Sequence, residues 1–192
     1  TEGADPVHKV TIIPRGSAGG FMMPLPEEKL VTGSKDIIAE IRVLFGGRAS
    51  EELVLDDIST GAYSDIKRAT QLAKVYVTKV GMNSEFGPVN LEASDDMNYN
   101  WIPNISDETS REIDLEVRKM LKVEYDNTLN VLRNNRDKLD ALAQKLLDKE
   151  VIFREDLEEI FGKRAWDPEL TEKPVSSLDN PADAGNVLNT ES

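Results

Sequence analysis

The sequence predicts a mainly α-helical fold with a small β element near its N-terminus. Over most of residues 34–161, apolar side chains recur every three or four positions, which is the period of one helix face. Before them, residues 7–13 form a β-branched stretch that ends at Pro14-Arg15-Gly16, which is typical of a strand closed by a turn. Serine precedes and glycine follows several of the periodic stretches, as expected at the beginnings and ends of helices.

The β element is predicted to contain a second, shorter extended segment at residues 21–25. Pro24 and Pro26 limit its length, because proline has no N–H to donate to a neighbouring strand.

The first helix is predicted to begin at Ser34, whose side chain can cap the free N–H groups of the first turn. Gly46-Gly47 falls inside this helix, and two interpretations stay open: the pair interrupts the helix, or it lets another backbone approach closely. A second helix is predicted over about 61–80, where Gly81 stops it. Its apolar stripe includes Ala62, Ile66, Ala69, Ala73, Val77 and Val80.

A third helix is predicted after Ser106, which is followed by the acidic pair Asp107-Glu108. A break is expected near Asn134-Asn135, before a fourth helix. Residues 151–161 are predicted to form one more short helix, which Gly162 ends.

Two stretches have no clear helical period. Residues 92–104 are predicted to be a mobile surface loop, and the polar, proline-containing residues from 163 onward a disordered acidic tail. The sequence therefore predicts one domain over residues 1–162 and a tail over residues 163–192.

Composition excludes several classes of function. The formal net charge of −13 argues against binding to a nucleic-acid backbone or to an anionic membrane surface. The absence of cysteine excludes disulfides and thiolate chemistry. No apolar stretch approaches the roughly 20 residues that a membrane-spanning helix needs.

Asp65 is the candidate functional residue that the helical spacing singles out. It shares a face with Ala62, Ala69 and Leu72, so it is a carboxylate among small and apolar neighbours. Such a carboxylate needs a cation or several hydrogen-bond donors if it is buried. Spacing alone favours a simpler role, in which Asp65 stabilises the first helical turn by about 0.3–1 kcal/mol.

Several separated motifs resemble one known family. They are Asp5-Pro6-Val7-His8-Lys9-Val10-Thr11-Ile12-Ile13-Pro14-Arg15-Gly16, Gly46-Gly47-Arg48-Ala49-Ser50-Glu51-Glu52, Ser59-Thr60-Gly61-Ala62-Tyr63-Ser64-Asp65-Ile66, Gly81-Met82, Phe86-Gly87-Pro88-Val89 and Ser106-Asp107-Glu108-Thr109. In this order they resemble the peptidase domain of the FtsH family, the membrane-anchored, ATP-dependent AAA+ zinc metalloproteases. The resemblance covers roughly residues 4–162 and implies a helical peptidase domain.

The resemblance implies that Asp65 is the third protein ligand of zinc. The family's other two ligands and its general base belong to a His-Glu-x-x-His helix. The 192 residues lack that motif, so no catalytic residue is assigned in this chain, and the helix is expected upstream of Thr1. We expect the chain by itself to be inactive.

Two further sites are predicted with weaker support. Glu52, four residues after Arg48, is the better candidate for a carboxylate that orients a zinc-bound histidine, whereas a solvated, ion-paired helix face is the simpler alternative for Glu51 and Glu52. Gly19, Gly20 and Phe21 flank a strand edge that could hold an extended substrate, although an ordinary hairpin fits equally well. His8 is expected to lie outside the metal site.

By resemblance, the parent protein is a homohexamer that binds ATP through its AAA+ module and threads protein substrates, both regulatory and damaged, into a peptidase ring for protein quality control. It is expected in the bacterial inner membrane with this domain in the cytoplasm, or alternatively in a mitochondrial or chloroplast membrane. Membrane contact is expected only through N-terminal segments that these residues do not contain, and no nucleic acid is expected.

Two rival hypotheses remain. The parent could be a pseudoprotease that lacks the histidines and serves as an oligomerisation scaffold. The chain could also be an acidic helical interaction module, which leaves the motif matches as coincidence.

Overall fold

The structure is a computed structural model that describes residues 1–16, 19–25, 30–91 and 105–164. The chain divides into two units, Thr1–Phe161 and Gly162–Ser192. The loop predicted at 92–104 and most of the tail predicted at 163–192 lie outside the described residues.

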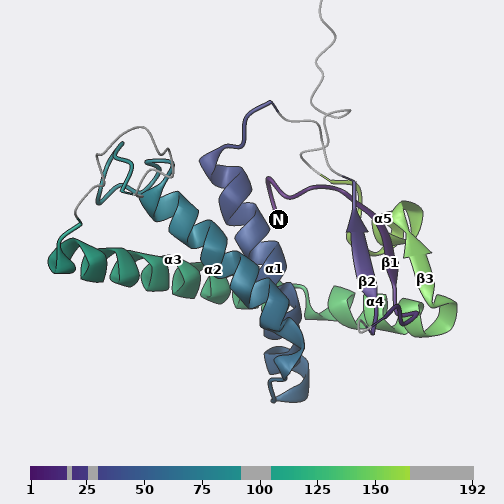
Figure 1. Cartoon of the computed structure of the whole chain (residues 1–192). Helices are drawn as coiled ribbons and strands as arrows, with labels where there is room; N and C mark the ends of the chain where they lie inside the picture. The colour runs from purple at the N-terminus through teal and green to yellow at the C-terminus, as the bar shows by residue number, and fades with distance from the viewer. Residues whose placement is uncertain (17–18, 26–29, 92–104, 165–192) are drawn as a thin grey trace, which may run out of the picture. The chain divides into compact units, whose positions relative to one another are not determined.

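The described chain is mainly helical, with one small sheet (Figure 1), which confirms the predicted fold class. In chain order the elements are β1 (Val7–Thr11), β2 (Phe21–Pro24), α1 (Ser34–Leu55), the 3₁₀ turn η1 (Thr60–Ala62), α2 (Tyr63–Thr78), α3 (Asp107–Asn134), α4 (Arg136–Lys149), β3 (Val151–Phe153) and α5 (Arg154–Phe161). No helix among the described residues is both long enough and apolar enough to cross a membrane.

The sheet is antiparallel, with the strand order β2-β1-β3. Strand β3 corrects the prediction of a helix over 151–161, because only its second part, α5, is helical. Ile152 pairs with Val10 and is completely buried, which explains why these β-branched and aromatic residues form a strand. The preceding carbonyl of Glu150 accepts hydrogen bonds from the Ile12 N–H and the Thr11 hydroxyl, both at 3.0 Å.

Helix α1 continues through Gly46-Gly47 without a break, so the pair does not interrupt it. A Cβ atom added at either glycine would meet no atom within 4 Å, so no other part of the described chain approaches the pair closely. The interpretation that the pair interrupts the helix was therefore wrong, and the interpretation that it lets another backbone approach stays a prediction. The helix ends instead at Asp56, whose φ of 52° is left-handed.

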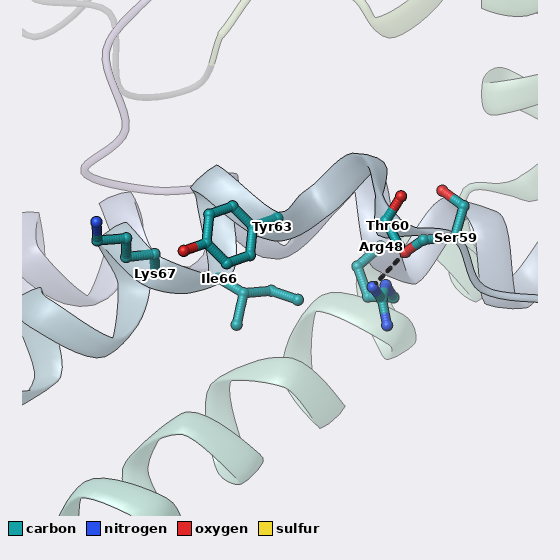
Figure 2. A pocket seen from close by; sticks show the side chains of 6 residues that line it. All are labelled: Arg48, Ser59, Thr60, Tyr63, Ile66 and Lys67. Carbon is teal, nitrogen blue, oxygen red and sulfur yellow. Dashed lines mark hydrogen bonds between the residues drawn. The ribbon is translucent and has the colours of Figure 1, made fainter.

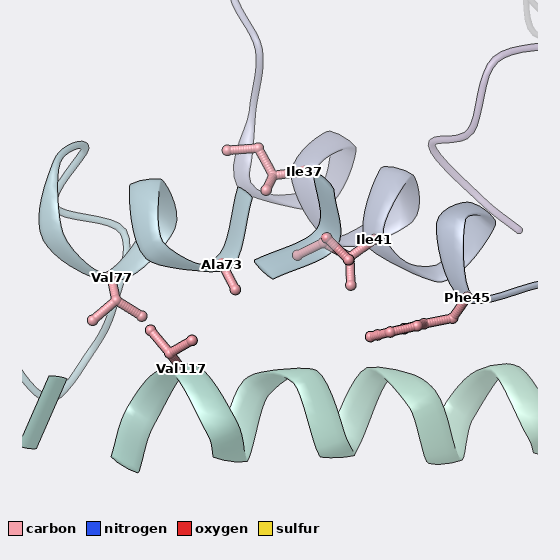
Figure 3. Close-up of a cluster of buried hydrophobic side chains, with 7 residues drawn as sticks. Ile37, Ile41, Phe45, Ala73, Val77 and Val117 are labelled. Carbon is pink, nitrogen blue, oxygen red and sulfur yellow. The ribbon is translucent and has the colours of Figure 1, made fainter. Parts of the chain in front are cut away.

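The main core lies where α1, α2 and α3 pack together (Figure 3). Its buried members are Ile37, Ile41 and Phe45 of α1, Ala69, Ala73 and Val77 of α2, and Val117 of α3. The alanines of α2 are fully buried, and their small side chains let this helix approach its neighbours closely. The core therefore holds α2 by a stripe of residues spaced four apart, and this stripe leads toward Asp65.

Candidate functional site

Asp65 is the third residue of α2 and lies one turn before the buried Ala69. The residue is half-buried, and Ala62 in the preceding turn is also buried. Asp65 has no hydrogen-bond or ion-pair partner among the described residues, and it does not cap the helix. Its carboxylate oxygens are therefore free to accept a cation or donors from outside the described chain.

The turn that precedes α2 is capped by Ser59 rather than by Asp65. The Ser59 Oγ accepts a hydrogen bond from the Gly61 N–H at 3.1 Å, and this bond starts η1. The same hydroxyl donates to Glu51 Oε1 at 2.6 Å, and the Ser59 N–H donates to Glu51 Oε2 at 3.2 Å. Glu51 thus joins the last turns of α1 to the start of η1.

Arg48 completes this connection from the same helix. Its Nη2 donates to the Ser59 carbonyl at 2.7 Å (Figure 2), and its Nε lies 3.8 Å from Glu51 Oε2. The two hydrogen bonds from Ser59 lower the pKa of the Glu51 carboxyl, and the Arg48 guanidinium lowers this pKa further. Glu51 is therefore ionised at neutral pH, as its three interactions require.

An open hollow of about 330 Å³ lies beside this turn. It is lined by Arg48, Ser59, Thr60, Tyr63, Ile66 and Lys67. Figure 2 shows that α2 supplies the residues at one end and that Arg48 reaches Ser59 at the other. The hollow therefore spans the first two turns of the helix that carries Asp65.

Glu52 has a different environment from the one expected. Within the described chain, Arg48 pairs with Glu51, whereas Glu52 accepts a hydrogen bond from the Tyr125 hydroxyl of α3 at 2.6 Å. The spacing of four between Arg48 and Glu52 therefore does not produce an ion pair, because the loop that returns from α1 brings Ser59 over Glu51. Whether Glu52 orients a metal ligand stays a prediction.

For Glu51 the sequence predicted only an ion-paired helix face, with which its contact to Arg48 agrees, and its two hydrogen bonds from Ser59 were not predicted. Glu51 lies three residues after Arg48 and Glu52 lies four. Either spacing is compatible with an ion pair along a helix, so the sequence does not show which acid Arg48 contacts.

His8 lies on β1, at an irregularity in the pairing with β2 between Val7 and Lys9. It is exposed, and its ring packs edge-on against Phe153 of β3 with centroids 6.1 Å apart. Within residues 1–16, 19–25, 30–91 and 105–164, no three carboxylate or imidazole groups lie close enough to hold a metal. Asp65 fits one ligand position of a zinc site, since zinc accepts carboxylate oxygen, but these residues do not form a complete site.

Gly20 and Phe21 lie at the start of β2, the strand at one end of the sheet order. A Cβ atom at Gly20 would lie 2.5 Å from the Thr11 carbonyl oxygen, so a close contact with β1 requires glycine there. The half-buried Phe21 ring lies under the Lys9 ammonium, with Nζ 5.5 Å from its centroid, while Gly19 is exposed. The strand has β1 as its only neighbour in the described sheet, so its other side carries no paired strand.

Comparison with known proteins agrees with the motif pattern. Residues 1–160 match the family described as Peptidase family M41. A relative from Leptotrichia buccalis, named ATP-dependent zinc metalloprotease FtsH, is 62% identical over 168 residues, which is 87% of this chain and 22% of the relative. Relatives with the same name in Streptobacillus moniliformis and Thermus thermophilus are 61% and 40% identical over 78% and 83% of this chain, and over 22% and 26% of their own lengths.

The chain spans about a fifth of the length of the first of these relatives. The match nevertheless covers nearly all of residues 1–161, including the strands, the Ser59–Gly61 turn and α2. On this similarity, the chain belongs to peptidase family M41.

Proposed function

We propose that this chain is part of the peptidase domain of an ATP-dependent zinc metalloendopeptidase and that Asp65 is one protein ligand of its zinc. The observation that carries the proposal is a half-buried carboxylate without a partner in the described chain, at the end of a stripe of small buried residues. The names of the relatives support zinc and ATP dependence for the longer protein.

A bound zinc would supply an activated water and polarise the peptide carbonyl. In this chain, Asp65 would hold the ion through a carboxylate oxygen, and the packing of α2 would fix where that oxygen lies. The only histidine of the sequence is on β1, so two imidazole ligands and the general base must come from a His-Glu-x-x-His helix elsewhere in a longer protein. On this proposal the 192 residues alone have no peptidase activity.

The unpaired side of β2 is proposed to bind substrate. An extended peptide can add to such an edge through main-chain hydrogen bonds, which do not depend on the substrate's sequence. Gly19, Gly20 and Phe21 at the start of this strand would then lie next to the bound peptide.

The proposed setting is a homohexamer whose AAA+ module, in the same polypeptide, uses ATP to unfold protein substrates for quality control. Membrane attachment through N-terminal segments of the longer protein, in the bacterial inner membrane or in an organelle membrane, is part of the same proposal. The names of the relatives support ATP dependence, and the family membership supports protein substrates and oligomerisation in general.

The test uses the full-length protein with Asp65→Asn, which keeps the side-chain size and removes the charge. We expect loss of bound zinc, measured by metal analysis, and loss of casein hydrolysis. The control is Asp126→Asn, which removes only an exposed ion pair with Lys122 on α3. Wild-type zinc content and activity in Asp65→Asn would refute the assignment, and a wild-type protein that forms hexamers without binding zinc would favour the scaffold hypothesis.

A further inference from the structure

We propose that Glu51 and Arg48 are positioning residues that hold the Ser59–Gly61 turn and thereby set where the Asp65 carboxylate lies. This inference rests on the proposed role of Asp65. Glu51 and Arg48 would act on zinc binding only through the position of the Asp65 carboxylate. Neither side chain needs to touch the metal for this effect.

The connection from the turn to Asp65 is short and continuous. Ser59 caps η1, and the Tyr63 N–H at the end of η1 donates to the Thr60 carbonyl as α2 begins. Asp65 follows two residues later, inside the first turn of α2. No flexible segment separates the capped turn from the carboxylate, so a displacement of Ser59 is passed on to Asp65.

The two ends of this region are held by different kinds of contact. Ala69 and the residues after it are fixed by close packing in the three-helix core. The start is held by polar contacts from α1: Glu51 binds the hydroxyl and N–H of Ser59, and Arg48 binds its carbonyl. Asp65 lies between the two, and the polar contacts at the start orient its turn.

Gly61 lies in contact with both side chains of this connection. A Cβ atom at this position would lie 3.2 Å from the Ser59 Oγ and 3.7 Å from Glu51 Oε1. The φ of Gly61 is not in the left-handed region, and the tight contact is the one with the Ser59 Oγ, whereas 3.7 Å to Glu51 is an ordinary van der Waals distance.

If Glu51 and Arg48 only supported the fold, their removal would have a different consequence from the loss of a positioning role. The Glu51–Ser59 hydrogen bonds are at the surface, and the Arg48–Glu51 contact is a long ion pair, so removing them should change global stability little. An effect on metal binding that exceeds any effect on stability therefore distinguishes positioning from general support of the fold.

The experiment measures zinc affinity in the full-length protein, by competition with a chromophoric zinc chelator. Glu51→Ala removes the acceptor, and Ser59→Ala removes the hydroxyl while keeping Glu51. Ser59→Thr keeps a hydroxyl that can make both bonds. The matched control is Glu40→Ala. It removes another acid of α1, an exposed one that joins α1 to α2 by pairing with Arg68 at 3.2 Å.

We expect Glu51→Ala and Ser59→Ala to weaken zinc binding by about 10–100-fold, the range typical of residues that orient metal ligands. Ser59→Thr and Glu40→Ala should bind zinc like the wild type. The melting temperature of zinc-free Glu51→Ala should agree closely with that of the wild type, whereas Ser59→Ala should melt slightly lower because it also loses the cap on η1.

Wild-type affinity in both alanine variants, with zinc lost in Asp65→Asn, would overturn this inference and leave the proposed function intact. Loss of zinc in Ser59→Thr or Glu40→Ala equal to that in Ser59→Ala would overturn it as well. Wild-type zinc binding in Asp65→Asn would instead refute the proposed function on which it rests.

Discussion

The Ser59 hydroxyl donates a hydrogen bond to Glu51 Oε1 at 2.6 Å and so joins the start of the Asp65-bearing segment to helix α1. The same hydroxyl accepts the Gly61 N–H, so one side chain both caps η1 and anchors it. This double role explains why the sequence before α2 needs a small hydroxyl residue followed closely by glycine.

Gly20→Ala should destabilise the sheet. The added Cβ would lie 2.5 Å from the Thr11 carbonyl oxygen and 3.1 Å from the Ile12 Cα, which are backbone atoms and cannot rotate away. We expect a loss of about 1–3 kcal/mol in the free energy of unfolding, the usual range for overpacking. Urea unfolding of the 192-residue chain measures it, and an unchanged midpoint would contradict the close approach of β2 to β1.

Gly47→Ala should have the opposite effect. Gly47 is exposed inside α1, and a Cβ atom there meets nothing within 4 Å. Alanine restricts the unfolded chain and favours the helix, so we expect stabilisation by about 0.5–1 kcal/mol. The same urea experiment measures the change, which makes this variant the matched control for Gly20→Ala. Destabilisation would indicate that another chain packs closely on this part of α1.

Tyr125 should ionise later than an ordinary tyrosine. Burial raises the pKa of Tyr125 to about 12, and its hydrogen bond to Glu52 contributes to the rise. Because the folded-state pKa exceeds the unfolded value of 10.0, the associated stability is fully present below pH 10 and is lost as the pH rises toward 12. Ultraviolet titration should show one late tyrosinate that is absent from Tyr125→Phe.

The Tyr125→Phe variant also tests the hydrogen bond itself. It should lower the free energy of unfolding by about 1 kcal/mol, because Glu52 is exposed and can bind water instead. The edge-to-face contact of the ring with Phe45, at 5.3 Å between centroids, is available to phenylalanine. A loss of several kcal/mol would mean that Glu52 is less solvated than the structure indicates.

Asp156 should hold β3 against α5 in a pH-dependent way. Its carboxylate accepts hydrogen bonds from Lys149 Nζ at 2.6 Å and from the Phe153 N–H at 3.2 Å, and Lys145 Nζ lies 3.2 Å away. The bond from Lys149, followed by those from the Phe153 N–H and Lys145, lowers the pKa of Asp156 well below 3.8. The resulting stability is present above pH 3.8 and is lost as the pH falls toward the folded-state pKa.

In Asp156→Asn, we expect faster amide hydrogen exchange at Phe153, because its acceptor loses its charge. The control is Glu155→Gln, which changes the neighbouring acid of the first turn of α5. Equal exchange rates at Phe153 in both variants would show that the carboxylate does not hold this strand end.

Regular periodicity was sufficient to predict the helices and the mainly helical class. The Ser106 cap is also confirmed, since its Oγ accepts the Thr109 N–H at 3.1 Å. Strand β3 was not predicted because three residues are too few to show a period, and Val151–Phe153 becomes a strand only by pairing with β1. Local sequence carries no information about that partner, which lies about 140 residues earlier.

The sequence by itself determined that Asp65 begins a helix with a small, apolar face, because that depends only on residue types spaced three and four apart. Only the tertiary structure decided which acid anchors the turn before that helix. Glu51 and Glu52 are both within reach of Arg48 along α1, but the loop from Asp56 to Ser59 returns over Glu51, and α3 brings Tyr125 to Glu52. Helical spacing shows which side chains can reach Arg48. Which of the two adjacent acids makes the contact depends on the segments that pack beside each of them.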